Sequence, residues 1–210
     1  MFRKGLLWAE LCALFVALPL LYYFQIIRVP KIPLLVGLAL VALGILWKTP
    51  DYNRQSLFHG LRGYEKFIKP ILIRSALLFT LSVLIIVLVD ARLLFQFPRN
   101  QPLVWAAVML LYPLLSAYPQ EVLYRAYFFQ RYQKILPNEY SLLLVNAAAF
   151  SLLHIVFDNA VAITLTLPAS LLFASSYVRS GSLLIPSIEH ALYGCIIFTT
   201  GLGRFFYNPS

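Results

Sequence analysis

The chain has 210 residues, of which 61% are hydrophobic and only 12% are charged, and its mean hydropathy is +0.80. Soluble domains are about half apolar and about a quarter charged, so this composition excludes a soluble globular domain and predicts an integral membrane protein. The formal net charge of +9 comes from basic residues scattered between apolar runs, which argues against a nucleic-acid partner and for contacts with lipid headgroups.

Seven apolar runs follow one another along the chain, each near the length that crosses a bilayer. They are Leu6–Ile27, Ile32–Trp47, Ile71–Leu94, Leu103–Phe129, Ser141–Phe157, Ala160–Val178 and Leu183–Gly203. The sequence therefore predicts an all-α, polytopic transmembrane helix bundle of about seven spans, in a single integral membrane domain over residues 1–210. The first run is too long for a cleaved signal peptide, so we expect a retained span.

A polar segment at residues 48–69 separates the second and third runs. Two interpretations fit it equally well: an amphipathic helix lying in the cytoplasmic interface of the membrane, and a solvated loop. Its interleaved apolar and basic residues are Leu57, Phe58, Leu61, Tyr64, Phe67 and Ile68 among Arg54, Arg62, Lys66 and Lys69.

Basic residues divide unequally between the two sides of the predicted bundle. With a cytoplasmic N-terminus, ten of the 17 lie on the cytoplasmic side and five on the other, while Arg74 and Arg125 lie within spans. The excess of lysine and arginine in cytoplasmic loops therefore predicts that the N-terminus is cytoplasmic.

Glu121 and Arg125 stand four residues apart in the apolar stretch YPQEVLYRAYFF, from Tyr118 to Phe129. An ionisable residue within a span costs at least roughly 2.5 kcal/mol, so it is rare unless it is paired or functional. The spacing places both on one helix face with the acid first, the better order for an ion pair. Pro119 predicts a kink, or the start of a new helical segment, just before them.

His154 and His190 lie on two further predicted spans, and Glu189 is adjacent to the second. One isolated membrane histidine would favour a hydrogen bond to a neighbouring helix. Three spans that each bring a titratable group inward, Glu121, His154 and His190, supply the parts that hold and deprotonate a water and stabilise an oxyanion. The same three side chains could bind a zinc ion with one open position, although no cofactor is required.

The remaining polar residues of the spans suggest structural roles. Glu10 is expected to pair with another helix, and Asp158 and Asn159 are expected to form the turn between the fifth and sixth spans. Cys12 and Cys195 both lie in apolar runs, so no disulfide framework is predicted.

Three short stretches resemble the motifs of a known family, the CPBP family of intramembrane proteases, which includes the CAAX prenyl endopeptidases and bacterial proteins of bacteriocin processing or immunity. They are QEVLYR at 120–125, FSLLH at 150–154 and HALYG at 190–194. The resemblance places the motifs in a core at about residues 103–203. It implies helices around a polar cavity, a bacterial plasma membrane, and hydrolysis of a peptide bond near the membrane surface. The substrate it implies is a peptide or protein, lipidated or membrane-anchored.

Two residues depart from the family pattern. Gln120 stands where the family has its first glutamate, the residue usually assigned as general base, and Gly194 stands where an asparagine or equivalent is expected to donate to the oxyanion. We expect Glu121 to serve as base, with Gln120 and Arg125 supporting it. Neighbouring helical residues point about 100° apart, so Glu189 beside His190 is favoured as a pairing residue over a substitute base.

In the favoured hypothesis Glu121 and His154 activate a water, and His190 holds the oxyanion with help from Gln120. By helix rise, Glu121 and His190 lie roughly 12 and 10 Å from the cytoplasmic end and His154 roughly 20 Å, so tilt or shifted boundaries must bring them together. The alternatives are a non-catalytic binding, immunity or scaffold protein, favoured by Gln120 and Gly194, and a transporter or proton channel.

Overall fold

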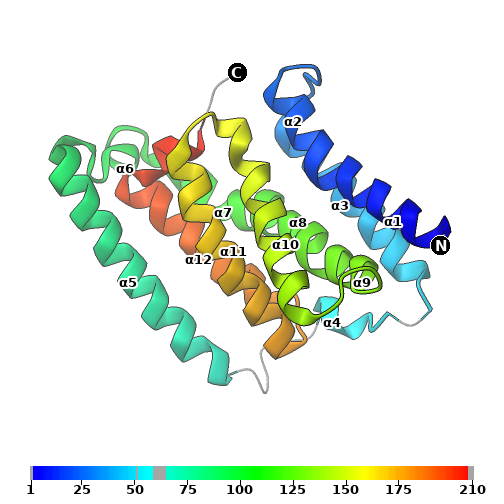
Figure 1. Cartoon of the computed structure of the whole chain (residues 1–210). Coiled ribbons are helices and arrows are strands. Elements are labelled where there is room, and N and C mark those ends of the chain that lie inside the picture. The colour runs from blue at the N-terminus through cyan, green and yellow to red at the C-terminus, as the bar shows by residue number, and fades with distance from the viewer. Residues whose placement is uncertain (1, 51, 59–64, 208–210) are drawn as a thin grey trace.

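The computed structural model describes residues 2–50, 52–58 and 65–207, and throughout these residues the regular secondary structure is helical. Long helices lie side by side and run up and down through one bundle (Figure 1). Six of them are long and apolar enough to cross a membrane, which confirms a polytopic helical membrane protein. The seventh predicted span forms α12 (Leu184–Thr200), an apolar helix of 17 residues that is shorter than the other six.

The first two spans form one edge of the bundle (Figure 1). The first consists of α1 (Phe2–Cys12), a π-helical turn at Ala13–Ala17 and α2 (Leu18–Tyr23). The second is α3 (Lys31–Lys48). The predicted run Ile32–Trp47 thus differs from its helix by one residue at each end.

The polar segment at 48–69 is helical over parts of its described residues. It contains the short helix α4 (Gln55–Phe58), and α5 (Glu65–Asp90) already begins within it; residues 59–64 lie outside the described residues. Leu57 is 2% exposed, and the Ser56 carbonyl accepts a hydrogen bond from the Leu183 N–H at 2.8 Å. Part of the segment therefore packs against the beginning of α12.

The fourth span is continuous but irregular. After a 3-10 turn at Ala91–Leu93 and α6 (Gln96–Asn100), it runs through α7 (Pro102–Tyr112), α8 (Tyr118–Glu121) and α9 (Phe128–Tyr132). Two π-helical turns, Pro113–Ala117 and Val122–Tyr127, join these three pieces.

Two prolines explain the positions of two of the π-turns. Pro19 and Pro119 each lie two residues after a π-turn, at Ala13–Ala17 and Pro113–Ala117. In a regular helix the proline ring would clash with the carbonyl four residues earlier, and a widened turn relieves that contact. Pro119 is the second residue of α8, so it lies at the start of a new helical segment within a continuous span, one of the two outcomes that the sequence predicts.

The last three helices are bounded by side-chain caps and glycines. The Asn138 side chain accepts from the Ser141 N–H at the start of α10 (Glu139–Leu153), and Asn159 accepts from the Ala162 N–H at the start of α11 (Ala160–Ser180). Asp158, with φ of 54°, and Asn159 form the turn between these helices, as predicted. Gly181 ends α11 at φ of 65°, a conformation that favours glycine.

Glu10 holds α1 against α9. Its carboxylate accepts hydrogen bonds from Tyr127 at 2.7 Å, Arg131 at 2.6 Å and Tyr132 at 3.0 Å. The prediction that Glu10 pairs with another helix is confirmed. Phe15 continues this contact with edge-to-face rings, 5.1 Å from both Tyr124 and Phe128 and 5.8 Å from Tyr132.

Candidate functional site

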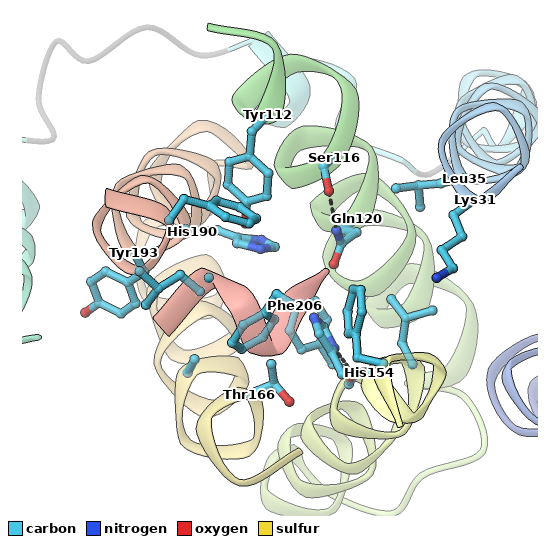
Figure 2. Close-up of a pocket in the computed structure, with 18 of the residues that line it drawn as sticks. Lys31, Leu35, Tyr112, Ser116, Gln120, His154, Thr166, His190, Tyr193 and Phe206 are labelled. Atoms are coloured by element: carbon cyan, nitrogen blue, oxygen red, sulfur yellow. Dashed lines mark hydrogen bonds between the residues drawn. The ribbon is translucent and has the colours of Figure 1, made fainter. Parts of the chain in front are cut away.

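A cavity of about 1250 Å³ opens between the helices, and its wall is mostly aliphatic and aromatic. Polar side chains line it as well, in smaller number. Those in its central part are Tyr112, Ser116, Gln120, His154, Thr166 and His190. Figure 2 shows them around one space, with Gln120 from α8 and His190 from α12 facing each other and His154 below them.

One face of the fourth span supplies Tyr112, Ser116 and Gln120 (Figure 2). The amide Nε2 of Gln120 donates to Ser116 Oγ at 2.9 Å, while Gln120 Oε1 is buried without a hydrogen-bond partner among the described residues. In a regular helix, residues eight apart point about 80° apart. The π-turn at Pro113–Ala117 absorbs one residue, so Tyr112 and Gln120 share a face as residues seven apart would.

Glu121 lies behind His190 and is not part of the cavity wall. The carboxylate is fully buried, and its Oε1 accepts from His190 Nδ1 at 2.8 Å. Its Oε2 lies 3.0 Å from Arg125 Nε, a close charge contact whose geometry does not meet that of a hydrogen bond. The structure therefore brings Glu121 to a histidine, where the sequence led us to expect it at a water.

Arg125 is fully buried and is surrounded by partners that suit a guanidinium. It donates to Asn146 Oδ1 and, at 3.3 Å, to Ser170 Oγ, and Asn146 in turn donates to the Tyr124 carbonyl at 2.5 Å. The Phe150 ring lies 5.0 Å from the guanidinium carbon. A buried charge needs such pairing to be tolerated, and the network joins the fourth span to α10 and α11.

His154 reaches the same cavity from the end of α10. Its Nδ1 lies 2.9 Å from the Phe150 carbonyl, which draws the imidazole back by about one helical turn. Both imidazoles contact the Phe150 ring, His154 at 4.9 Å and His190 at 5.5 Å between ring centroids. The imidazole of His154 therefore lies closer in depth to Glu121 and His190 than helix rise alone predicts.

Glu189 belongs to a separate cluster. Its carboxylate pairs with Arg74 at 2.7 Å and accepts hydrogen bonds from Ser176 at 2.5 Å and Tyr193 at 2.9 Å. It is fully buried and does not line the cavity. The cluster joins α5, α11 and α12, in agreement with the pairing role that the sequence favours for Glu189.

The three proposed metal ligands are not arranged as a metal site. Over the described residues, no three His, Cys, Asp or Glu side chains gather closely enough to hold a metal ion. Glu121 already contacts His190 and Arg125, so its oxygens do not turn toward His154. Glu121, His154 and His190 therefore do not fit a zinc ion as they stand, and no step is assigned to one.

Sequence reasoning missed several members of the site. Asn146 and Ser170 complete the surroundings of Arg125, and Tyr112 lies over Gly194, where an added Cβ would overlap the phenol ring. Asn146 carries a detectable signal, since it is a lone amide in the apolar run LLLVNAAAF. Tyr112 carries none, because a tyrosine in an apolar span usually packs or lies at the interface.

The fold and the site together define a multi-pass membrane protein with a buried carboxylate and two histidines beside an apolar cavity. A family model described as type II CAAX prenyl endopeptidase Rce1-like matches residues 101–196. Residues 101–196 therefore match a CAAX-protease-like family of intramembrane endopeptidases, in agreement with the CPBP resemblance. No curated protein and no solved structure matches the chain.

Proposed function

We propose that the protein is an intramembrane endopeptidase in which His190, oriented by Glu121, is the general base. The observation that carries the proposal is the buried hydrogen bond of 2.8 Å from His190 Nδ1 to Glu121 Oε1, at the wall of the cavity. A carboxylate at Nδ1 fixes the imidazole's tautomer and orientation and stabilises the imidazolium that forms during the reaction. Glu121 then acts through His190, and Arg125, 3.0 Å from its Oε2, holds it in place.

The hydrogen bonds of both histidines leave their second ring nitrogens free to accept. Each Nδ1 faces an acceptor, Glu121 for His190 and the Phe150 carbonyl for His154, which favours the neutral tautomer that has its proton at Nδ1 and a lone pair at Nε2. A water held by these two Nε2 atoms attacks the scissile carbonyl carbon and passes a proton to His190. The imidazolium then returns the proton to the departing amine, which completes hydrolysis.

The composition of the cavity wall suits an apolar substrate. Aliphatic side chains from α3, α5, α7 and α11 surround the polar centre, which suits a lipidated or membrane-anchored peptide segment. We further propose that the protein lies in a bacterial plasma membrane with a cytoplasmic N-terminus, which the ten-to-five distribution of loop cations supports.

The test is peptide cleavage by the purified protein in liposomes. The probes are a mixed set of farnesylated peptides with free C-termini and the same peptides without the lipid, with products identified by mass spectrometry. We expect cleavage by the wild type, and losses of kcat of about 10²- to 10⁴-fold in Glu121→Gln and His190→Ala, because a triad carboxylate replaced by its amide costs up to about 10⁴.

Glu10→Gln serves as a matched control, since it makes the same chemical change in a carboxylate that does not line the cavity. It should keep near wild-type kcat. The proposal fails if the wild type cleaves no probe, or if Glu121→Gln is as active as the wild type while all variants insert equally.

Gln120 favours a second candidate, a non-catalytic member of the family that binds a membrane peptide. An amide cannot take a proton from water, and it occupies the cavity wall opposite His190. This candidate predicts that the wild type binds the farnesylated probes without cleaving them, and that His190→Ala leaves the dissociation constant within about threefold. Equilibrium binding to the same liposomes separates it from the hydrolase.

A further inference from the structure

The reaction needs hydrogen-bond donors for an oxyanion, and the two histidines do not supply them. Their protons are held at Nδ1 by Glu121 and by the Phe150 carbonyl, so their Nε2 atoms face the substrate as acceptors. The described polar groups at the centre of the cavity that can donate are then the Gln120 amide and the hydroxyls of Tyr112, Ser116 and Thr166. The Thr166 hydroxyl already lies 2.7 Å from the Ala162 carbonyl.

Tyr112 is the donor whose ring packs against His190. Its ring meets the imidazole edge-on with centroids 6.0 Å apart, and it also packs edge-on against the Phe198 ring at 5.3 Å. None of the hydrogen bonds formed among the described residues uses the Tyr112 hydroxyl. The phenol therefore keeps its proton available to a ligand of the cavity, while its ring is held in a defined orientation.

Gly194 explains how the hydroxyl reaches this position. It lies one helical turn after His190 on α12, and both residues line the cavity. A Cβ at Gly194 would overlap Tyr112 Cε1, Cζ and the hydroxyl oxygen, so the hydroxyl end of the ring occupies the space above the glycine. Any larger residue would push the phenol away from His190.

We propose, on the basis of the proposed function, that Tyr112 is a catalytic residue whose hydroxyl donates a hydrogen bond to the oxyanion formed when the His190-activated water attacks. The negative charge develops on the former carbonyl oxygen, and the phenol keeps its proton throughout. The proton taken from water stays on His190 and goes to the leaving amine.

The test is the activity of Tyr112→Phe in the liposome cleavage assay. The substitution keeps the ring and removes one hydroxyl. One lost oxyanion donor costs about 10²- to 10³-fold in kcat, so we expect a loss of about a hundredfold with KM within about threefold. Tyr118→Phe is the matched control, because Tyr118 lies on the same span outside the cavity wall; it should keep wild-type kcat.

A double variant tests for a recovery of activity that would not occur if Tyr112 had only a structural role. In Tyr112→Ala with Gly194→Asn, the amide of the new side chain fills the vacated space and offers an N–H beside His190. We expect the kcat of this double variant to be at least tenfold higher than that of Tyr112→Ala. Adding Gly194→Ala to Tyr112→Ala should leave kcat unchanged.

The outcomes separate the two proposals. Cleavage by the wild type and by Tyr112→Phe at equal kcat overturns the role of Tyr112 and leaves the hydrolase standing. A larger KM with unchanged kcat makes Tyr112 a substrate-packing residue and also overturns the inference. Absence of cleavage by the wild type overturns the hydrolase and this inference with it.

Discussion

At the scale of single residues, Gln120 and Glu121 show how adjacent side chains divide between two environments. Gln120 faces the cavity, while Glu121 is turned behind His190 into contact with Arg125. The sequence places both near the histidines but does not say which of them meets a substrate. That choice depends on helix phase, and one π-turn changes the phase by about the 100° that separates neighbours.

Gln120→Glu is expected to raise kcat by about tenfold. A carboxylate at this position can take a proton from water directly, and general bases typically contribute 10²- to 10⁴-fold, part of which His190 already supplies. The measurement is kcat in the liposome assay. Gln133→Glu, which adds the same charge in an exposed segment, controls for net charge and should leave kcat unchanged. A fall in kcat for a correctly inserted Gln120→Glu protein would contradict the prediction.

At the scale of elements, the apolar runs determine the positions of most spans, and the π-turns determine which side chains face the site. The predicted run Ala160–Val178 becomes α11 at Ala160–Ser180, because the Asn159 cap and Gly181 mark both of its ends. The π-turn at Val122–Tyr127 contains Arg125 and no proline, so no residue pattern predicts it. Span positions were therefore predictable from hydropathy, whereas the directions in which the side chains of Glu121, Tyr112 and Gln120 point were not.

A deletion and an insertion in the same turn test the role of the π-turn at Pro113–Ala117. Deletion of Leu114, a residue that is 62% exposed, places Tyr112 and Gln120 seven positions apart, so that they share a face in a regular helix. Insertion of one alanine after Leu114 turns Tyr112 by about 100° away from the cavity. We expect the deletion to keep at least a third of wild-type kcat and the insertion to lose about a hundredfold, with Leu114→Ala as the control. The opposite order would show that the π-turn does not set the facing of Tyr112.

At the scale of the whole molecule, the clusters outside the cavity decide how the bundle is assembled. Glu10 joins the first span to α9, and Glu189 joins α5 to α12 through Arg74. Neither partnership can be assigned from sequence, because Arg131 and Arg74 lie 121 and 115 residues from their partners and no local spacing relates them. Hydropathy predicts that such helices exist but not which of them touch.

The orientation of the bundle is testable by cysteine labelling. In a background of Cys12→Ser and Cys195→Ser, we expect Arg92→Cys to react with a membrane-impermeant maleimide in intact bacteria and Lys134→Cys to react only after lysis. The reason is the excess of cations on the side of the N-terminus. Labelling of Lys134→Cys in intact cells, with Arg92→Cys protected, would invert the topology.

The short helix α12 also bears on how a reaction that consumes water proceeds inside a lipid bilayer. Its 17 residues extend about 26 Å, whereas the hydrocarbon core is about 30 Å thick. Such hydrophobic mismatch is met by local thinning of the membrane or by polar groups that enter it. Either response brings the aqueous boundary closer to His190, which lies about 9 Å from the beginning of α12. The length of this helix thus shortens the path by which water from the surface reaches the histidine that would activate it.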